Sequence, residues 1–510
     1  MSRRPPAVAA ATPSRPNAQG RTKGAKSTAK AHERPSAMPR PKGAPADGKA
    51  PRRAVRPAPR PSAVWEVTAE LFPPLDAAAQ ALLARLPEAL ARVRPLTGAH
   101  RRSLPEDIAA LSRALTAERA ELRRPYWSRP AFVSAYLHYF LPWNLVRLTR
   151  LFRGLPLPAP EGGNGPALLL DAGSGPLTVP LALWLARPEW RAAPVQVLAL
   201  DSASQPLELG RALFAALGDV TGEPVWPVRL ERGPLESLAA RALPLLRQGG
   251  RPWLVTAANV LNEVRPARRG HGSARGDDED GGMPGGLEDL EAGPEDALGE
   301  RLDRLLAAWA PLLGPDEAGL PPGEDAADRG PVPPALLFVE PGTRLGGTTL
   351  MRLRELALEG GLHAVVPCTA DTPCPLSRGA WCHFTFSPQG APRWLAELTA
   401  AAGLTKRSLS LSPLLLTAAP ESEEGESPSR EAPAREARVL SSPFVVPGVD
   451  GLARYGCAPC GLALLEEAGA VASGSLVRLG REERRRDARS GARLFAPGGK
   501  RAPVRLKKKS

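Results

Sequence analysis

The stretch Leu168-Leu-Leu-Asp-Ala-Gly-Ser-Gly-Pro176 decides the fold class of this chain. A short apolar run that ends in Asp171 and a glycine turn is typical of a strand that leads into a helix. An apolar run without alternation is expected for a strand of a parallel sheet that is covered on both faces. The stretch therefore predicts the first strand of an α/β sheet.

Strands and helices alternate downstream of this stretch. The predicted strands are Ala167–Asp171, Val195–Asp201, Pro252–Ala257 and Ala335–Glu340, and the predicted helices are Leu177–Ala186, Leu207–Leu217, Leu298–Leu313 and Thr348–Glu359. Short apolar strands separated by helices are the signature of a parallel, doubly wound sheet. The predicted fold class is therefore α/β.

Composition divides the chain into several parts. Low complexity predicts a disordered basic tail, and leucines at helical spacing predict a helical region after it. The predicted parts are a tail at 1–62, a helical region at 63–155, an α/β domain at 156–417, a linker at 418–438, a small C-terminal module at 439–476 and a basic tail at 477–510. Within the α/β domain we expect acidic or proline-rich loops at 265–296 and 314–334 and a Cys-rich loop at 361–390.

Charge is distributed unevenly over the 510 residues, which carry a net +14. Residues 1–62 hold 15 Lys and Arg against two acids, a net +13, and residues 477–510 hold 13 against three, a net +10. Residues 63–476 therefore account for −9 of the total. Two basic ends on an acidic body favour a polyanionic partner, and we expect both ends to contact nucleic acid. The alternative is that they only keep the chain soluble.

The chain shows no signal for a membrane or for export. No apolar run approaches the ~20 residues that a membrane span requires, and the N-terminus lacks the apolar stretch of a secretory signal. Five cysteines, clustered late in a long chain, favour reduced thiols over a disulfide framework. We therefore expect a cytoplasmic protein without membrane contact.

The glycine turn predicts a nucleoside pocket. Gly173 and Gly175 follow the first strand, where open α/β sheets bind ligands and where glycine lets the backbone approach a ligand closely. Asp171 can accept hydrogen bonds from the turn or the ligand, and Asp201 at the end of the second strand can accept both hydroxyls of a ribose. This combination suits S-adenosylmethionine or a dinucleotide.

Two departures from the dinucleotide fingerprint favour S-adenosylmethionine. Thr178 stands where that fingerprint has its third glycine, and Pro176 removes an N–H group that a pyrophosphate would use. S-adenosylmethionine has no phosphate and loses nothing by this. The alternative is a strand-to-helix turn that binds no ligand.

Polar residues also follow a later strand, in Thr256-Ala-Ala-Asn-Val-Leu-Asn-Glu-Val264. Asn259, Asn262 and Glu263 are candidates for placing a substrate or for catalysis, and Asn259 is a further candidate for cofactor binding. The alternative is helix capping, since Asn is a preferred N-cap residue.

The cysteines predict an inorganic site. Cys368, Cys374 and Cys382 lie within fifteen residues, and Cys457 and Cys460 follow at a distance. Structural zinc usually requires closer cysteine pairs, whereas iron–sulfur clusters accept irregular loops and need four thiolates. Spacing alone does not choose the fourth ligand. The alternatives are a zinc site, in which His383 could take part, and a nucleophilic cysteine without visible activating neighbours.

Five segments of the chain resemble the small-ribosomal-subunit methyltransferase-like family, which includes mitochondrial ribosome-assembly factors and their bacterial relatives. They are Asp171-Ala-Gly-Ser-Gly-Pro176, Val260-Leu-Asn-Glu263, Glu340-Pro-Gly-Thr343, Cys374-Pro-Leu376 and Trp381-Cys-His-Phe384. The likeness covers about Tyr126–Ala470 without the acidic insertions, and the Trp-Cys-His-Phe segment is its most specific part.

The resemblance implies a class I (Rossmann-like) methyltransferase sheet with a Cys-rich cluster-binding insertion. It implies S-adenosylmethionine and a 4Fe-4S cluster as cofactors, and the small ribosomal subunit or its rRNA as partner. The family's clustered ligands carry over onto Cys368, Cys374 and Cys382, and its C-x-x-x-G block carries over onto Cys457 and Gly461, which favours Cys457 over Cys460.

The function implied by the resemblance is binding or methylation of small-subunit rRNA during assembly. Two alternatives stay open: a catalytically inactive assembly factor that retains the cofactor pocket, and a zinc-binding methyltransferase that acts on another substrate.

Overall fold

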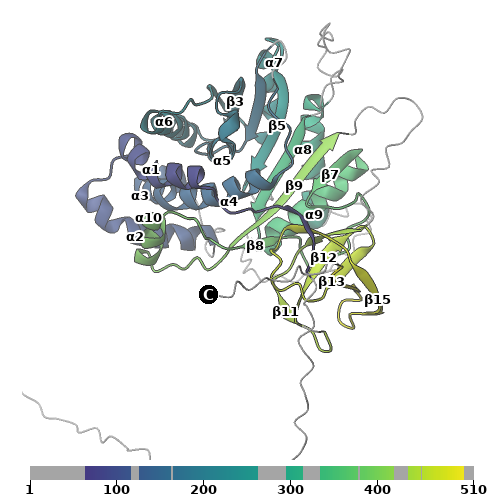
Figure 1. Ribbon diagram of the computed structural model, residues 1–510. Helices are drawn as coiled ribbons and strands as arrows, with labels where there is room; N and C mark the ends of the chain where they lie inside the picture. The colour runs from purple at the N-terminus through teal and green to yellow at the C-terminus, as the bar shows by residue number, and fades with distance from the viewer. Residues whose placement is uncertain are drawn as a thin grey trace, which may run out of the picture. The chain divides into compact units, whose positions relative to one another are not determined.

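A computed structural model describes most of the chain outside its ends. The described residues are 64–116, 126–161, 165–261, 294–313, 334–376, 380–418, 435–449 and 451–498. They belong to one compact unit, residues 61–510, which contains two sheets (Figure 1). The predicted tail at 1–62 lies outside the described residues, as do nearly all of the loops at 265–296 and 314–334 and most of the linker.

The first sheet is largely parallel. In spatial order its strands are β4 (Val228–Arg232), β3 (Val195–Asp201), β2 (Ala167–Ala172), β5 (Arg251–Ala258), β6 (Ala335–Pro341), β9 (Leu409–Ala418) and β7 (Leu362–Val366), and β8 (Phe384–Phe386) also pairs with β9. The first five run in parallel, whereas β9 is antiparallel to both β6 and β7. The strand order reverses between β2 and β5, and open sheets bind ligands at the carboxyl ends of the strands beside such a point.

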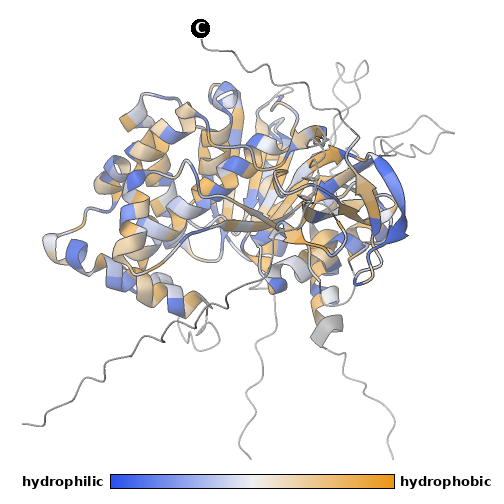
Figure 2. Ribbon diagram, turned by 60° about the horizontal axis from the view of Figure 1, so that its bottom comes forward, coloured by the Kyte–Doolittle hydropathy of each residue, from blue (hydrophilic) through white to orange (hydrophobic). Residues whose placement is uncertain are grey.

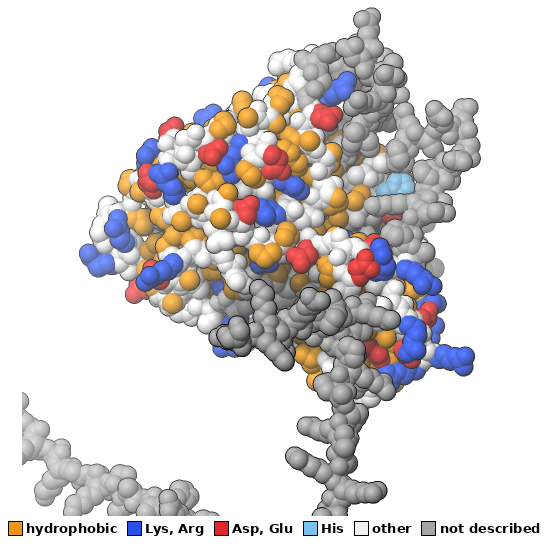
Figure 3. All heavy atoms as spheres, in the orientation of Figure 1, with side chains coloured by type: hydrophobic (Ala, Val, Ile, Leu, Met, Phe, Trp, Pro, Cys, Tyr) orange, Lys and Arg blue, Asp and Glu red, His pale blue; other side chains and the backbone are white. Residues whose placement is uncertain are grey.

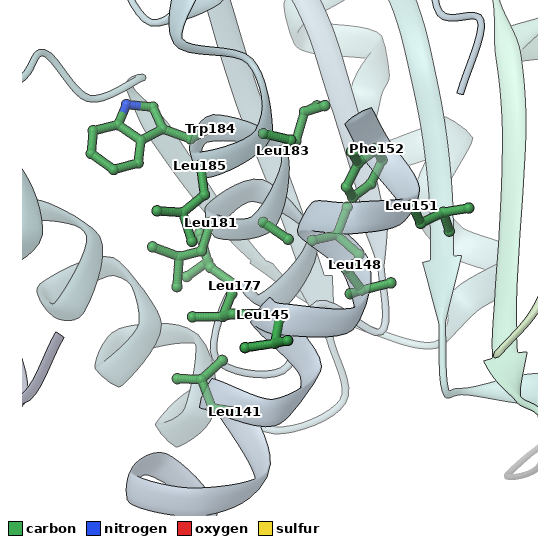
Figure 4. Packing of buried hydrophobic residues seen from close by; sticks show 14 of the residues in the cluster. Leu141, Leu145, Leu148, Leu151, Phe152, Leu177, Leu181, Leu183, Trp184 and Leu185 are labelled. Atoms are coloured by element: carbon green, nitrogen blue, oxygen red, sulfur yellow. The ribbon is translucent and has the colours of Figure 1, made fainter. Parts of the chain in front are cut away.

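The side chains of β2 explain why its sequence is uniformly apolar. Leu169 packs into a core shared with α4 (Leu141–Gly154), α5 (Thr178–Ala186) and α6 (Ser204–Thr221). Leu168 and Leu170 point to the other face, where α7 (Leu238–Leu246), α8 (Pro294–Trp309) and α9 (Arg344–Glu359) cover the sheet. Figure 4 shows leucines of α4 and α5 packed together on the first of these faces. The predicted α/β sheet with helices on both faces is thus confirmed.

The predicted helices are present with shifted ends. Helix α9 begins four residues before the predicted Thr348, because the Thr343 side chain caps it by accepting a hydrogen bond from the Gly346 N–H. Helix α6 extends beyond the predicted Leu207–Leu217 and ends at Gly222, which has a φ of 75° and closes the helix in the left-handed conformation.

The N-terminal part of the described chain is mostly helical. It contains α1 (Ala77–Val93), α2 (Gly98–Thr116) and α3 (Pro130–Ala135), which pack on the α4–α6 side together with α10 (Arg393–Ala401). Short helical segments lie at η2 (Tyr126–Ser128), η3 (Tyr136–Phe140), η4 (Pro188–Trp190), η5 (Leu235–Ser237) and η7 (Ala310–Leu312). None of the described helices is long and apolar enough to cross a membrane.

The second sheet is mostly antiparallel. Its strands are, in spatial order, β1 (Val67–Glu70), β14 (Ser475–Arg478), β10 (Glu436–Val439), β12 (Leu452–Ala458), β13 (Gly461–Leu465), β16 (Arg493–Ala496) and β15 (Arg481–Arg486), with β11 (Phe444–Val445) beside β12. Only β13 and β16 among these pair in parallel.

This second sheet corrects two expectations. Residues 477–510 are not simply a basic tail, because β15 and β16 lie within them, and the helical region at 63–155 begins with strand β1. The sequence of β15 is Arg-Glu-Glu-Arg-Arg-Arg, a charge run that resembles a tail. It forms a strand because it lies at the edge of the sheet, where one side pairs with β16 and the side chains stay in water.

Candidate functional site

The glycine turn lies at the carboxyl end of β2 and holds two left-handed residues. Gly173 has a φ of 69° and Gly175 a φ of 52°. A Cβ at Gly173 would lie 2.6 Å from the Cγ2 of Val260, so packing excludes any larger residue there. A Cβ at Gly175 would meet nothing within 4 Å. The backbone at Gly175 is therefore open to an approaching ligand.

Asp201 connects this turn to the next one. Its Oδ2 accepts a hydrogen bond from the Gly175 N–H at 2.9 Å, and its Oδ1 accepts one from the Ala203 N–H at 2.9 Å. Each carboxylate oxygen has a second lone pair, so Asp201 can also accept hydrogen bonds from two ligand hydroxyls. The glycine turn after β2 and the acid at the end of β3, which were predicted to act together, lie side by side at the carboxyl ends of these strands.

Asp171 lies beneath the turn and is almost completely buried, with 1% of its surface exposed. Its Oδ1 accepts a hydrogen bond from the Thr256 hydroxyl at 2.6 Å, while its Oδ2 has no hydrogen-bond partner among the described residues. Burial raises the pKa of Asp171 to about 7, and the hydroxyls of Ser174 and Thr256 oppose this by favouring the ionised form. A carboxyl with an unused buried oxygen is suited to meet a donor from a bound cofactor.

The Asp171 carboxyl predicts a pH-dependent stability. The folded state keeps a proton that the unfolded chain releases above pH ~4, so this contribution to stability is lost as the pH rises through about 7. From pH 5 to pH 8 the loss is about 3 kcal/mol, at ~1.4 kcal/mol per pH unit below the folded pKa. Urea unfolding of the original chain and of Asp171→Asn at both pH values checks this. The unfolding free energy of the variant, relative to that of the original chain, should be higher at pH 8 than at pH 5. An equal pH profile for the two proteins would contradict it.

The residues after β5 contact the same turn. Asn259 has a φ of 60°, and its N–H donates to the Val339 carbonyl at 2.7 Å. The next residue, Val260, packs on Gly173, and the Leu261 N–H donates to Oε1 of the fully buried Glu340 at 2.9 Å. The other two candidates, Asn262 and Glu263, lie outside the described residues.

Three residues near the carboxyl ends of these strands had no predicted role. Ser174 and Thr256 face Asp171, and Glu340 holds the backbone after β5. Of the three, Glu340 could have been predicted from the sequence, because an acid at the end of an apolar strand needs a hydrogen-bond donor when it is buried.

The cysteines form a second site. Cys368, Cys374, Cys382 and Cys457 all line one cavity of about 40 Å³. Cys460 does not line this cavity and is exposed. His383 does not line it either; its Nδ1 lies 3.2 Å from the Trp381 carbonyl oxygen.

Both sheets contribute to the cavity. Cys368 follows β7 and Cys382 precedes β8 in the first sheet, while Cys457 lies on β12 of the second sheet. The Ser412 hydroxyl of β9 donates to the Cys382 carbonyl at 2.8 Å, which fixes the backbone at that thiol. The arrangement therefore joins two parts of the chain that are more than seventy residues apart in sequence.

The electrostatics of the cavity oppose four free thiolates. Burial, and after it the neighbouring thiols of Cys368 and Cys374, raise the pKa of Cys457 to about 12. Burial also raises the pKa of Cys368 and of Cys382, against the opposing effect of the Arg354 guanidinium. Four thiols this close can ionise together only around added positive charge, which metal ions supply.

Four cysteines of the cavity could act as ligands for an inorganic group. No three His, Cys, Asp or Glu residues among those described are arranged around a single metal position. The four cysteines line, together with mostly apolar residues, a cavity of about 40 Å³, whereas one water-sized probe needs only ~10–15 Å³. Four cysteines around such a space match the ligand set of an iron–sulfur cluster.

The fold and the first site define the class of protein. A parallel sheet that continues into an antiparallel strand between its last two members is the order of class I methyltransferases. The glycine turn after β2 and the acid after β3 lie where those proteins bind their cofactor. The chain is therefore methyltransferase-like in fold.

Comparison with known proteins adds the family. A family model described as "Rsm22: Mitochondrial small ribosomal subunit Rsm22" matches residues 328–396, which include three of the cavity cysteines. The resemblance predicted from the sequence is thus confirmed over this segment, which is similar to the Rsm22 family.

Two further comparisons carry less information. None of the curated proteins matches the chain. One solved structure, a human methyltransferase 10 domain containing protein, is similar over 61% of this chain and 97% of its own, with 9% identity and a TM-score of 0.23. A TM-score this low has no weight for the fold.

Proposed function

We propose that the chain is an S-adenosylmethionine-binding, iron–sulfur methyltransferase-like protein that binds rRNA and acts on or assembles the small ribosomal subunit. The observation that carries the proposal is the convergence of Cys368, Cys374, Cys382 and Cys457 on one cavity. The family segment at 328–396 contains three of these cysteines and links the proposal to the small ribosomal subunit.

The proposed inorganic group is a 4Fe-4S cluster held by these four cysteines. Structural zinc usually takes cysteines in closely spaced pairs, whereas iron–sulfur clusters take four thiolates from loops of irregular spacing, as in this chain. A cluster of several iron atoms fits thiols that surround a space. Because Cys457 comes from the second sheet, the cluster would hold the two sheets together.

The proposed organic cofactor is S-adenosylmethionine. Gly175 leaves the backbone open, Asp201 can accept the ribose hydroxyls, and Asp171 has an unused buried oxygen. When bound, this cofactor supplies a methyl group that is already electrophilic, so orientation by the protein provides much of the catalysis. Asn259 lies at the carboxyl end of β5, where it can orient a substrate.

Strand β15 supports an RNA partner. Figures 2 and 3 show this edge as the most hydrophilic strand and as a gathering of Lys and Arg side chains. Arg481 and Arg485 form ion pairs with Glu483 and Glu466, whereas no ion pair is recorded for Arg484 or Arg486 among the described residues. Exposed arginines on a fixed strand are suited to contact phosphates.

Sedimentation with ribosomal particles tests the proposed function. The full chain should migrate with small subunits in a sucrose gradient and bind purified small-subunit rRNA. Transfer of labelled methyl from S-adenosylmethionine to stripped small subunits would identify an enzyme, and cofactor binding without transfer would identify an assembly factor. A chain that stays at the top of the gradient and binds no RNA would contradict both.

The charge of β15 predicts how RNA binding depends on salt. Replacing Arg484 and Arg486 with Gln should make the slope of log K against log salt less negative by about 1.4, since each phosphate contact in single strands contributes ~0.7. The matched control replaces Arg85 and Arg92 on α1, two exposed arginines that pair with Glu88. Titration of small-subunit rRNA at several salt concentrations measures both slopes. An unchanged slope in the β15 variant, or an equal change in the control, would contradict the prediction.

A further inference from the structure

Arg354 forms hydrogen bonds with the loop that begins at Cys368, on the side of the first sheet. It lies on α9, has 4% of its surface exposed, and donates from Nε to the Cys368 Sγ at 2.9 Å. Its Nη2 donates to the carbonyls of Ala370 and Thr372 at 2.9 and 2.8 Å. Its Nη1 is buried and has no hydrogen-bond partner among the described residues. One guanidinium thus holds both a thiol and the backbone that follows it.

Arg438 is bonded to the same loop from the second sheet. It lies on β10 with 7% of its surface exposed, and its Cα pairs with that of Cys457 on β12. Its Nε donates to the Pro367 carbonyl at 3.3 Å and its Nη1 to the Gly474 carbonyl at 2.9 Å. Because Pro367 directly precedes Cys368, the two arginines hold this loop from two elements, Arg354 from α9 and Arg438 from β10 of the second sheet.

Neither arginine forms an ion pair with a described carboxylate, although the Glu436 carboxylate acts on Arg438 from a longer distance. Among the described residues, no Asp or Glu oxygen lies within 4.0 Å of the Arg354 or Arg438 guanidinium. Burying an unpaired charge costs several kcal/mol, so such charges are retained where something compensates them. Arg354 lines the cavity and donates to one of its thiols, and the thiols of Cys368, Cys382 and Cys457 act on Arg438 after Glu436.

The charges balance when the site holds its metal. Four thiolates around a 4Fe-4S core in its oxidised state, or around one zinc ion, carry a formal charge of 2−. Two buried guanidinium groups bring the total to zero. When an iron–sulfur cluster gains one electron its formal charge becomes 3−, and two fixed positive charges then stabilise it more strongly.

We propose that Arg354 and Arg438 are positioning residues of the four-cysteine site, which hold the Cys368 loop in place and supply the counter-charge that retains the metal and favours the reduced cluster. The inference rests on the proposed function, since it requires the cavity to hold a metal–thiolate group. It assigns these two arginines to the site although neither is a ligand.

Substitution of each arginine in the full-length chain, purified without oxygen, tests the inference. Arg354→Gln and Arg438→Gln should each shift the ratio of reduced to oxidised cluster at least tenfold towards the oxidised form at a fixed potential, which is 59 mV for one electron. Both should lose iron to a chelator at least tenfold faster. Reductive titration followed by electron paramagnetic resonance, and iron release over time, measure the two effects.

Two further variants separate charge from folding. Arg354→Lys keeps the positive charge but lacks the planar guanidinium that donates several hydrogen bonds at once. The reduction potential of the cluster should therefore stay near that of the original chain, while iron is lost faster. Arg454→Gln is the matched control, because Arg454 is also buried in the second sheet and donates to the carbonyls of Ser441 and Ala468. It should change neither measurement.

The outcomes distinguish this inference from the function on which it rests. An original chain that holds neither iron nor zinc overturns the proposed site. A metal-loaded chain whose Arg354→Gln and Arg438→Gln variants keep the original potential and iron release overturns the inference alone, as does an equal shift in Arg454→Gln. If the metal is zinc, transfer of zinc to a chelator replaces the redox titration, with the same tenfold acceleration expected.

Discussion

Replacing Cys457 with Ser should abolish the inorganic group, with less than a tenth of the iron of the original chain remaining. Cys457 is the proposed ligand from β12, while the other three cavity cysteines follow β7 and precede β8. A serine hydroxyl is a poor ligand for iron because it does not ionise as a thiol does. Three thiolates cannot complete a four-cysteine cluster. Iron analysis and visible absorption after purification without oxygen measure the loss.

Cys460→Ser is the matched control for this substitution. Cys460 lies three residues further along, at the turn between β12 and β13, and is exposed rather than directed into the cavity. Its replacement should leave the iron content unchanged. Cluster loss in Cys460→Ser with retention in Cys457→Ser would show that the fourth ligand has been assigned to the wrong residue.

Replacing Gly175 with Ala should weaken S-adenosylmethionine binding at least tenfold, equivalent to about 1.4 kcal/mol. The added methyl group enters the open space in front of the turn, which the proposed cofactor occupies. The left-handed φ of 52° also strains any residue with a Cβ, by about 1 kcal/mol. Strain alone, however, would lower the stability of the fold without acting on the cofactor.

Gly222→Ala separates these two effects. Gly222 ends α6 with a φ of 75° and, like Gly175, would place a Cβ with nothing within 4 Å. Both variants should lose about 1 kcal/mol of unfolding free energy, and only Gly175→Ala should lose cofactor affinity. Calorimetric titration and urea unfolding of the two proteins measure this. Equal affinities in the two variants would contradict the assignment of the cofactor site.

Much of the sheet could be predicted from the sequence because its strands are covered on both faces. The apolar run before Asp171 identified β2, and similar runs identified β3, β5 and β6. Strand β9 was not predicted, although seven of its ten residues are buried, and burial alone would not have given its direction. The charged strand β15 was missed because its partner β16, and not its own pattern, makes it a strand.

The candidate sites could be predicted where one residue type is required. Glycines with positive φ, an acid at a strand end and clustered cysteines each have few alternative uses. Arg354 and Arg438 could not be predicted, because they bind backbone carbonyls that any residue would present. The same applies to Thr256, whose role depends on the register that places it beside Asp171. Such partners are set by pairing between distant segments.

Metal and sulfide analysis of the original full-length chain, purified without oxygen, tests the central claim most directly. We predict about four iron atoms and four acid-labile sulfides per chain, with the broad visible absorption of a cluster held by Cys368, Cys374, Cys382 and Cys457. A colourless protein that contains no iron would contradict the account.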